Sequence, residues 1–484
     1  MTRLREIVAA LDGARLLVRA PPVERLPDIT GLSADSRSVT PGALYCAVRG
    51  SAADGHAYVA AAAAAGAAAA LVETPQPVDL PQIEVQDGRR AAVVAAETWF
   101  GRPAARLHLY GVTGTNGKTT SVVLARHVLS ALAPTGSIGT LGAFDAAGQP
   151  VPSEAGSLTT PGPIGLQATL AALVERGTQG VAMEVSSHSL DQGRVDGLVF
   201  QAAVFTNFTR DHLDYHKTMD DYFRAKARLQ SYVAPAGLEV VNADEAAWQR
   251  LRRERRRVTF GERSGDVRAR GVAVDGRGGR FELVTPTGSV DACLPLLGRF
   301  NVVNALGVAA CAWGLGVPLD TIAERLGTAP QVPGRMERIA SHPCTVLRDY
   351  AHTPDALERA LETLRPLTAG RLIVVFGAGG DRDRGKRAPM GQTAARLADL
   401  AIVTSDNPRT EDPERILDDI EAGMGGRAHE RITDRRAAIA RALEMARPDD
   451  TVLLAGKGHE TYQVLGTTRL PFDESRVVRE LGAE

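Results

Sequence analysis

Short apolar runs alternate with helix-period segments along most of the chain. Apolar runs of this length, bounded by turn residues and separated by helical segments, are typical of buried strands in an α/β sheet. We predict strands at residues 43–48, 69–72, 180–185, 202–207, 237–242, 345–349, 372–376, 401–404 and 451–454. The pattern therefore predicts an α/β fold.

The length of the chain and its breaks predict several domains. A chain of 484 residues is longer than one hydrophobic core usually supports. Pro330 and the Pro-Gly-Arg sequence at 333–335 separate two helix-like segments from the strand at 345–349. We predict three domains, at residues 1–100, 101–332 and 333–484. The first is expected to be a small α/β unit, and the third a doubly wound sheet.

Residues 107–131 form the most informative stretch, with an apolar run, a glycine-rich turn and a helix-period segment in that order. Gly114 and Gly117 allow successive backbone amides to point at a phosphate group. Lys118 supplies a positive charge for the outer phosphates, and Thr119 supplies an oxygen for Mg²⁺. The alternative is a strand-to-helix turn without a ligand. We predict ATP binding.

Polar residues follow two predicted strands of the same domain. Glu184 ends the run at 180–185, and His212 follows the run at 202–207. The carboxyl ends of parallel strands meet at one edge of a sheet, so both residues are expected near the phosphates. A carboxylate and an imidazole suit magnesium, although a lone histidine is more often structural. Lys226, in a probable helix further on, is interpreted by itself as an ordinary surface lysine.

Three charged loops follow predicted strands of the third domain, at residues 379–386, 405–409 and 456–460. Arginine side chains can bind a carboxylate through two hydrogen bonds, and acidic side chains can bind an ammonium group. The same residue types also form ordinary turns. Because all three loops combine both charges, we predict a pocket for a zwitterion.

Composition excludes several functional classes. The formal net charge of −1 gives no basic surface for nucleic acid or for an anionic membrane. The one basic cluster, at residues 250–257, is expected to be a solvated helix face. Its alternative, a nucleic-acid arm, lacks interleaved aromatic residues.

The cysteines and the apolar segments indicate a cytoplasmic protein. The four cysteines have no metal-site or disulfide-framework spacing, which fits a reducing compartment. The N-terminus has no signal-peptide core, and the alanine-rich run at 60–70 is too weakly apolar to span a bilayer. We expect that run to be a packed helix, and we expect no membrane insertion.

Several motifs taken together resemble the Mur ligase family. They are Thr-Gly-Thr-Asn-Gly-Lys-Thr-Thr (113–120), Met-Glu-Val-Ser-Ser-His (183–188), Asp-His-Leu-Asp-Tyr-His (211–216), Gly-Arg-Phe-Asn-Val-Val-Asn (298–304), Asp-Tyr-Ala-His-Thr-Pro (349–354) and Gly-Lys-Gly-His-Glu (456–460). The resemblance spans nearly the whole chain. It implies a three-domain α/β architecture with a central phosphate-loop ATPase-like domain and a C-terminal Rossmann-like domain, acting as a monomer in the cytoplasm.

The resemblance also implies a reaction, in peptidoglycan biosynthesis. An ATP-dependent ligase would add diaminopimelate, with the meso form favoured, to the D-Glu γ-carboxylate of UDP-N-acetylmuramoyl-L-Ala-D-Glu through an acyl phosphate. The cofactors would be ATP and Mg²⁺. Alternatives are the same ligase using lysine, ornithine or LL-diaminopimelate, a folylpolyglutamate synthase-like ligase, and a regulatory protein that binds nucleotide without making a bond.

By the same resemblance, individual residues acquire roles. The catalytic residues would be Lys118, His212 and Lys226. ATP would be bound by Gly114, Thr115, Asn116, Gly117, Lys118, Thr119, Thr120, Asn301, Arg335 and Asp349, with His352 nearby. Magnesium would be held by Thr119, Glu184, His212 and a carbamoylated Lys226. A carbamate would turn a repelling cation into an oxygen ligand.

The resemblance also implies which residues contact the two remaining substrates. The UDP-linked substrate would contact Ala34, Ser36, Ser51, Ala52, Ala53, Thr159, Thr160, Ser186, Gln192 and Arg194, although spacing alone makes Ser36 a turn residue. The amino acid would contact Arg382, Asp406, Asn407, Pro408, Arg409, Gly456 and Glu460. Arg409 would favour diaminopimelate over lysine, because only diaminopimelate carries a second carboxylate at that end.

Overall fold

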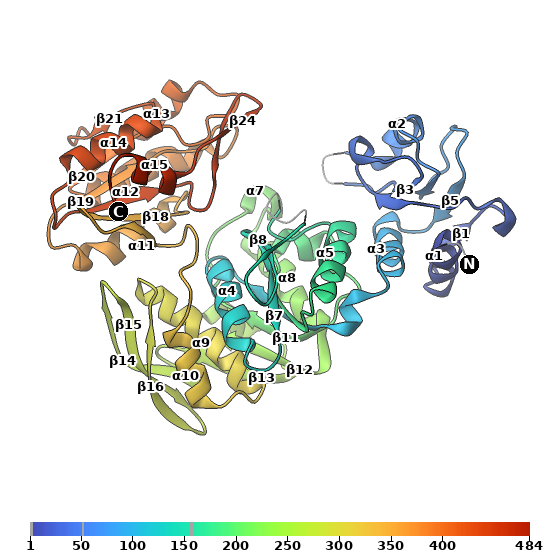
Figure 1. Ribbon diagram of the computed structural model, residues 1–484, viewed down its shortest axis with the longest axis horizontal. Helices are drawn as coiled ribbons and strands as arrows, with labels where there is room; N and C mark the ends of the chain where they lie inside the picture. Colours follow the sequence, from blue (N-terminus) through green and yellow to red (C-terminus); the bar gives the residue numbers. More distant parts are fainter. Residues whose placement is uncertain (1–2, 51–52, 154–157) are drawn as a thin grey trace. The chain divides into compact units, whose positions relative to one another are not determined.

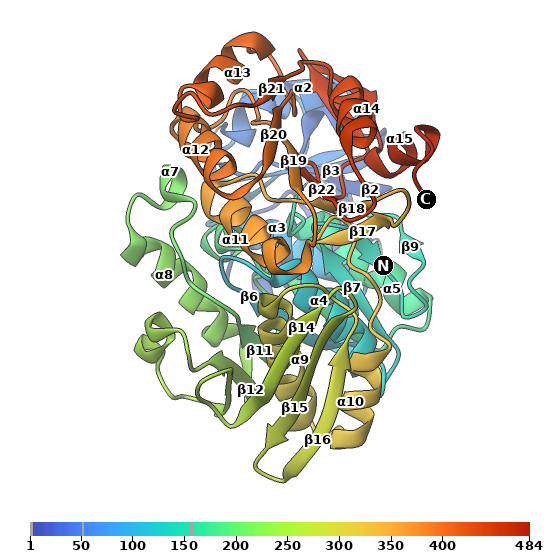
Figure 2. The same cartoon turned by 90° about the vertical axis from the view of Figure 1, so that its left-hand side faces the viewer.

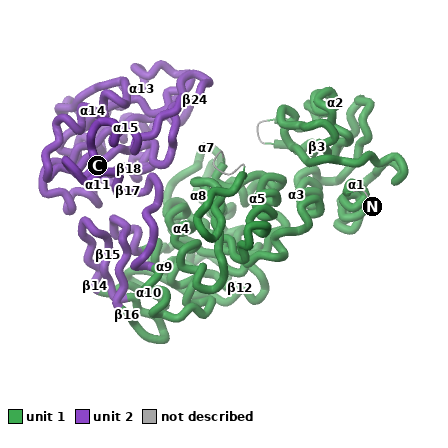
Figure 3. Tube along the Cα trace, in the orientation of Figure 1, with its two compact units in different colours: residues 1–270, 283–290, 303–325 green, residues 271–282, 291–302, 326–484 purple. Residues whose placement is uncertain are grey.

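The computed structural model describes residues 3–50, 53–153 and 158–484 (Figure 1). The chain divides into two compact units, which Figure 3 shows in different colours. Unit 1 contains residues 1–270, 283–290 and 303–325, and unit 2 contains residues 271–282, 291–302 and 326–484. Among the described residues, no helix is long and apolar enough to cross a membrane.

The N-terminal part of unit 1 contains a five-stranded sheet in the order β1-β5-β4-β3-β2. Its strands are β1 (Leu17–Arg19), β2 (Gly31–Ser33), β3 (Ala43–Cys46), β4 (Ala69–Val72) and β5 (Gln82–Val85), and its helices are α1 (Arg3–Gly13), α2 (Val59–Ala64) and α3 (Gly88–Trp99). Apolar residues of α1 and α3 share one core with β3, β4 and β5. The strands predicted at 43–48 and 69–72 are confirmed. The alanine-rich run is helical only as far as Ala64, because β4 begins within it.

The central sheet contains eleven strands in the order β16-β15-β14-β13-β12-β11-β6-β10-β7-β8-β9. Their bounds are β6 (His108–Thr113), β7 (Thr135–Gly139), β8 (Gly142–Phe144), β9 (Pro150–Val151), β10 (Gly180–Glu184), β11 (Phe200–Phe205), β12 (Val233–Asn242), β13 (Arg256–Gly261), β14 (Val267–Asp275), β15 (Gly278–Thr285) and β16 (Gly288–Leu294). β10 and β11 run parallel to β6 on its two sides, so all three strands end at the same edge of the sheet. The boundary between the units crosses β14, β15 and β16.

Helices connect these central strands. They are α4 (Lys118–Leu129), α5 (Pro163–Glu175), α6 (Ser187–Asp191), α7 (Leu213–His216), α8 (Met219–Ala227), α9 (Arg299–Gly314) and α10 (Leu319–Gly327). The three strands predicted for the central domain are confirmed as β10, β11 and β12, although β11 and β12 begin earlier than the apolar runs.

The basic cluster at 250–257 is exposed at Arg252, Arg253 and Arg256, as expected, but it is not the helix face that we predicted. A short 3-10 helix ends at Arg250, and the strand β13 begins at Arg256. The Arg257 side chain is only 11% exposed and pairs at 2.5 Å with Glu239, which is fully buried. The buried acid on the neighbouring strand β12 draws this arginine into the sheet.

Unit 2 contains a six-stranded sheet in the order β17-β18-β22-β19-β20-β21 and a two-stranded hairpin. The bounds are β17 (Glu337–Ala340), β18 (Thr345–Asp349), β19 (Leu372–Phe376), β20 (Leu400–Val403), β21 (Glu430–Arg431), β22 (Thr451–Ala455), β23 (Tyr462–Leu465), β24 (Thr468–Pro471), α11 (Pro354–Leu364), α12 (Arg387–Leu397), α13 (Pro413–Glu421), α14 (Arg435–Met445) and α15 (Glu474–Glu480). Strands β18 to β21 and β22 are parallel, and the edge strand β17 is antiparallel.

Helices cover both faces of this sheet (Figure 2). Alternate residues of one strand enter different cores: Val374 packs with α11, α12 and α13, and Ile373 packs with α14 and α15. A parallel sheet that is buried on both faces is the doubly wound arrangement. The architecture predicted for the C-terminal domain is confirmed.

Candidate functional site

The phosphate loop connects β6 to α4 and depends on two glycines. Gly114 and Gly117 have φ angles of 149° and 83°, which favour glycine. A Cβ atom on Gly114 would lie 1.9 Å from Oγ1 of Thr206, and one on Gly117 would lie 2.2 Å from Oδ1 of Asn304. Both close approaches also require glycine. Sequence reasoning quoted the motif that contains Asn304 but did not name Asn304 as a site residue.

The residues that follow β11 hold this loop in shape. Asn207 accepts a hydrogen bond from the amide of Asn116 at 2.8 Å and donates one to its carbonyl at 3.0 Å. Thr206 donates to the same carbonyl at 2.8 Å. The Thr115 hydroxyl donates to the carbonyl of Thr209 at 3.1 Å. Asn207 was missed as a site residue; its position at the end of a predicted strand beside the loop was the available signal.

Two lysines meet at one carbonyl of the loop. Nζ of Lys118 donates to the carbonyl of Gly114 at 3.0 Å, and Nζ of Lys226 donates to the same oxygen at 2.6 Å. Lys226 is 1% exposed, so its interpretation as a surface lysine is wrong. Burial, together with the positive charge of Lys118, lowers the pKa of Lys226 well below 10.5. Both effects favour the neutral amine of Lys226 over its ammonium form.

Glu184 is the last residue of β10, and His212 lies in the segment between β11 and α7; β10 and β11 flank β6. The Glu184 carboxylate is 1% exposed and accepts hydrogen bonds from the amide of Thr140 at 2.8 Å and from its hydroxyl at 3.2 Å. The His212 side chain is 44% exposed, and its ring centroid lies 4.8 Å from that of His188. An oxygen donor and an imidazole are therefore available at the edge where the phosphate loop lies.

The donor set fits a magnesium ion that is held mainly by a nucleotide. Thr119 is the second residue of α4 and is 6% exposed. Across the described ranges, no group of three or more histidine, cysteine or acidic side chains is arranged to hold a metal. Mg²⁺ usually keeps several waters and uses one or two protein ligands together with phosphate oxygens. A threonine hydroxyl and a buried carboxylate suit that arrangement.

Residues predicted to contact the UDP-linked substrate form a connected network in the central part of unit 1. Thr160 is fully buried, and its carbonyl accepts a hydrogen bond from Nη1 of Arg194 at 3.0 Å. The guanidinium of Arg194 also donates to Gln192 at 2.9 and 2.6 Å. Ser186 caps α6, and its amide donates to the hydroxyl of Thr160 at 3.3 Å. The hydroxyl of Thr140 donates to that of Thr159 at 3.3 Å.

The predicted contacts of the first domain are simpler. Ser36 begins a 3-10 helix, Ser36–Ser38, which Asp35 caps, so the turn predicted there is confirmed. Ala34 and Ala53 are exposed. Ser51 and Ala52 lie outside the described residues.

One group of predicted nucleotide residues surrounds Tyr350 in unit 2. The guanidinium of Arg335 lies 4.6 Å from the centre of the Tyr350 ring, and burial raises the pKa of Asp349. His352 contacts the carbonyl of Tyr350 at 2.7 Å through Nδ1, and burial lowers its pKa. The ring of His459, whose pKa burial lowers to about 4, lies 5.4 Å from that of Tyr350. Both imidazoles are therefore neutral near pH 7.

Asn301 and Thr120, two further predicted nucleotide residues, are both buried. Asn301 is 1% exposed at the start of α9 and donates to the carbonyl of Leu297 at 2.7 Å. Thr120 is 4% exposed in the first turn of α4.

A buried lysine organises the predicted amino-acid pocket of unit 2. Lys457 is fully buried and donates to Oδ1 of Asn407 at 3.1 Å. Its Nζ lies 3.6 Å from Asp406 and 3.4 Å from Glu460. The side-chain Nδ2 of Asn407 also donates to Glu460 at 2.8 Å. Gly456, with a φ of 115°, brings the backbone close to Asp406. Sequence reasoning quoted Lys457 within its motif but missed its role.

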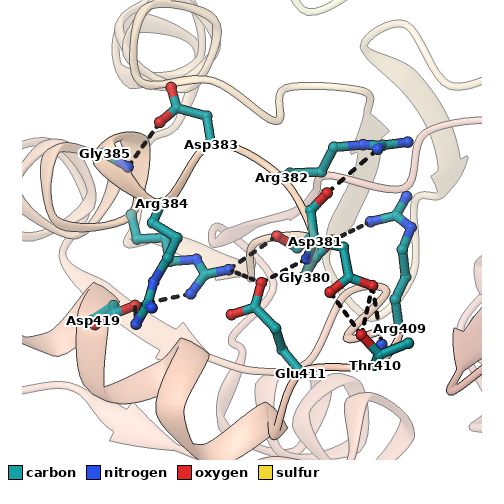
Figure 4. A network of polar contacts seen from close by, with 12 residues as sticks. Gly380, Asp381, Arg382, Asp383, Arg384, Gly385, Arg409, Thr410, Glu411 and Asp419 are labelled. Carbon is teal, nitrogen blue, oxygen red and sulfur yellow. Dashed lines mark hydrogen bonds and ion pairs between the residues drawn. The ribbon is translucent and has the colours of Figure 1, made fainter. Parts of the chain in front are cut away.

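Arg409 has a constrained backbone and a guanidinium that crosses to the neighbouring loop (Figure 4). Its φ of 53° is left-handed, its amide donates to the carbonyl of Val464 at 3.0 Å, and its carbonyl accepts from Gly466 at 2.7 Å. Its Nη1 donates to the carbonyl of Gly380 at 2.7 Å. Arg382, on the same loop as Gly380, donates to the carbonyl of Asp381 at 3.4 Å. The structure thus brings the predicted cationic side chains of two separate loops into one region.

Comparison with family models identifies three matching segments. The Mur ligase family catalytic domain matches residues 28–106, the Mur ligase middle domain matches residues 112–312, and the Mur ligase glutamate ligase domain matches residues 334–458.

Comparison with individual proteins gives matches over nearly the whole chain. A relative from Gloeobacter violaceus, named UDP-N-acetylmuramoyl-L-alanyl-D-glutamate--2,6-diaminopimelate ligase, is 46% identical over 461 residues, with 94% of each chain covered. A solved structure of a ligase with that name is 34% identical, with a TM-score of 0.64 and 94% of each chain covered. A Mycobacterium tuberculosis folylpolyglutamate synthase, solved with ADP, is 18% identical, with a TM-score of 0.65, and covers 81% of this chain and 94% of its own. The last match shows a shared fold alone.

Proposed function

This chain belongs to the Mur ligase family, and on that premise we propose that it is an ATP-dependent ligase acting in peptidoglycan synthesis. The enzyme joins an amino group of 2,6-diaminopimelate to the D-glutamate γ-carboxylate of UDP-N-acetylmuramoyl-L-alanyl-D-glutamate. The relative that is 46% identical over nearly the whole chain carries the name of this reaction, which favours it over the folate-type alternative.

The charge arrangement in unit 2 is the observation that carries the choice of amino acid. Asp406 and Glu460 lie beside Asn407, while Arg409 extends from the same loop toward Gly380. A substrate with an ammonium group and a carboxylate at its far end suits acids and a guanidinium in adjacent positions. Lysine would leave the guanidinium without a carboxylate partner. We therefore favour diaminopimelate, in its meso form.

The phosphate loop supports activation of the carboxylate by ATP. A carboxylate is a poor acylating group, because its leaving group would be oxide. Transfer of the γ-phosphate to the carboxylate gives an acyl phosphate and ADP, and the incoming amine then displaces phosphate. Lys118, the loop amides and the N-terminus of α4 supply positive potential for the phosphates. The loop is proposed to bind ATP through residues 114–120, with Asn301, Arg335 and Asp349 completing the nucleotide contacts.

Magnesium ligands and a modified lysine complete the catalytic proposal. Thr119, Glu184, His212 and a carbamoylated Lys226 would hold Mg²⁺, which supplies charge neutralisation for the phosphates when it is bound. The low pKa of Lys226 supports the modification, because a neutral amine can attack CO₂ to form a carbamate with release of a proton. His212 and Lys226 lie on the segments that follow β11.

The remaining substrate contacts and the organisation of the chain are also proposals. The network around Thr160 and Arg194 supports binding of the UDP-linked substrate there, together with Ala34, Ser36 and residues 51–53. The three larger sheets, of five, eleven and six strands, support division into domains at 1–100, 101–332 and 333–484. Four free cysteines support a reducing cytoplasm, and a monomer is the expected state.

The test is ATP-dependent phosphate release by the purified protein with UDP-N-acetylmuramoyl-L-alanyl-D-glutamate. Separate reactions contain meso-diaminopimelate, LL-diaminopimelate, lysine or ornithine, and the product mass is measured. Release with meso-diaminopimelate alone supports the whole proposal. Release with lysine or ornithine alone keeps the ligase and contradicts the role of Arg409. No release with any amino acid contradicts the reaction and requires folate-type substrates to be tested.

A further inference from the structure

We propose that Arg387 and Glu411 are positioning residues that orient Arg409 and so set the preference for the acceptor amino acid. This inference rests on the proposed function of the same pocket. It goes beyond the residues that would touch the amino acid, because Arg387 and Glu411 act through the loops that carry those residues. Figure 4 shows Glu411 among the labelled residues of the two loops.

Arg387 lies at the start of α12 and is fully buried. Its Nη1 pairs with Asp419 at 2.8 Å, and its Nη2 pairs with Glu411 at 2.9 Å. The same Nη2 donates to the carbonyl of Gly379 at 3.4 Å. A planar guanidinium with two carboxylate partners has a defined orientation, so Arg387 ties Gly379 and Glu411 together.

Glu411 connects Arg387 to the loop at 379–386. Its Oε1 accepts a hydrogen bond from the amide of Asp381 at 2.5 Å. The carboxylate of Asp381 in turn accepts from the hydroxyl of Thr410 at 2.8 and 3.0 Å and from its amide at 3.2 Å. Thr410 and Glu411 directly follow Arg409 in the chain. The contacts therefore form a closed circuit between the two loops that carry the predicted cations.

The circuit holds two residues in an unfavourable backbone conformation. Asp381 and Arg409 both have a φ of 53°, in the left-handed region that non-glycine residues rarely adopt. Such conformations persist where surrounding contacts enforce them. The hydrogen bond that the Asp381 amide donates to Glu411, and those that its carboxylate accepts from Thr410, supply that enforcement at Asp381. Without them, we expect the loop to relax and the carbonyl of Gly380 to move.

The two loops also pack too closely for any side chain between them. A Cβ atom on Gly380 would lie 1.9 Å from the carbonyl oxygen of Pro408, and one on Gly379 would lie 2.9 Å from Nη1 of Arg409. The Arg409 guanidinium thus rests on a glycine surface whose position is set by Arg387. Small displacements of a bidentate group cost much of its binding energy.

The experiment compares Arg387→Met and Glu411→Leu with a matched control, Arg384→Met. Arg384 also pairs with Asp419, at 3.2 Å, but its side chain is 66% exposed. The KM values for diaminopimelate and ATP, kcat, and the preference for diaminopimelate over lysine are measured with the UDP-linked substrate. We expect roughly a tenfold or larger rise in KM for diaminopimelate in both test variants, with little change in KM for ATP. Glu411→Gln keeps an oxygen acceptor and should restore most of the loss.

A second comparison separates positioning from general damage. If Arg387 acts through Arg409, then adding Arg387→Met to an Arg409→Met variant should cause no further rise in KM for diaminopimelate. An additive effect in the double variant, or equal rises in KM for ATP and diaminopimelate, contradicts the inference. Glu411→Leu provides the same test if Arg387→Met does not fold.

The outcomes also separate this inference from the proposed function. An inactive wild-type protein overturns the proposed function, and the preference argued here fails with it. An active wild-type protein whose Arg387→Met and Glu411→Leu variants retain its KM for diaminopimelate overturns the inference alone.

Discussion

Replacing Glu474 with glutamine should destabilise unit 2 strongly, because it breaks a fully buried ion pair. Glu474 begins α15, and its Oε1 lies 2.8 Å from Nε and 2.7 Å from Nη2 of Arg435. Both side chains have no exposed surface. The Arg435 guanidinium also donates to the carbonyl of Ala455 at 3.0 Å and to that of Ser405 at 3.4 Å. The pair therefore joins α14 and α15 to the ends of β20 and β22.

The expected loss follows from leaving one charge buried alone. Removal of one partner from a buried pair costs about 3–5 kcal/mol, because the remaining ion keeps its desolvation penalty without its counter-charge. Two carbonyl groups stay bonded to Arg435 and compensate only part of that penalty. We therefore expect Glu474→Gln to lower the free energy of unfolding by about 3 kcal/mol or more.

The assay uses two probes that report on different units. All three tryptophans, Trp99, Trp248 and Trp313, lie in unit 1, whereas circular dichroism reports on both units. In urea unfolding, we expect Glu474→Gln to shift the circular dichroism transition to lower urea and to leave the fluorescence transition nearly unchanged. If the two probes give separate transitions, the two units unfold independently, and each unit then has its own free energy of unfolding.

Two controls make the result decisive. Glu480 lies on the same helix and pairs with Arg476 and Arg436, each at 2.7 Å. These arginines are 76% and 47% exposed, so Glu480→Gln should change the free energy of unfolding little. The double variant Arg435→Met with Glu474→Leu should recover most of the loss, because it removes both buried charges. A loss below about 1 kcal/mol for Glu474→Gln, which is typical of an exposed pair, would refute the reasoning.

Three further predictions concern the proposed site. Lys226→Ala should abolish ligation, measured as phosphate release. Added short carboxylic acids should restore part of the activity, because the acid supplies the oxygen that the carbamate would provide. Absence of rescue contradicts the modification. A second prediction concerns the pKa of Lys226 in CO₂-free buffer. Between the lowered pKa of the folded protein and the unfolded value of 10.5, Lys226 is protonated in the unfolded chain but not in the folded one. The free energy of unfolding should therefore rise with pH in that window by up to about 1.4 kcal/mol per pH unit relative to Lys226→Met, and equal slopes in urea titrations would contradict the shift. Arg409→Lys should reduce kcat/KM for diaminopimelate roughly a hundredfold and narrow its preference over lysine, because a point charge replaces a bidentate donor; an unchanged ratio in the same assay contradicts the pocket.

Most strands and the phosphate loop could be predicted from the sequence, because both are encoded locally. The run at 372–376 coincides with β19, since buried parallel strands are continuously apolar and turn residues mark their ends. Glycines at 114 and 117 are required by the backbone angles of the loop itself. β12 begins earlier than its apolar run because backbone pairing extends into exposed residues beyond the hydrophobic ones.

The burial and pairing of individual side chains could not be predicted from the local sequence. Lys226 looks like a surface lysine in a polar helix, and only the approach of Gly114 and Lys118 makes it a buried lysine with a lowered pKa. Arg257 belongs to a basic run, but Glu239 on the neighbouring strand draws it into the sheet. In both cases the partner comes from a distant part of the chain, so local patterning carries no signal.

Local patterns in the chain were sufficient for the α/β class, for the order of strand, loop and helix around Lys118, and for the motifs on which the family rests. The tertiary structure decided which side chains share a site: Asn304 against Gly117, Lys457 among Asp406 and its neighbours, and Arg387 behind Arg409. The physical reason is that backbone conformation depends on near neighbours in the chain. Burial, charge pairing and pKa depend on neighbours in space, which the folded sheets alone bring together.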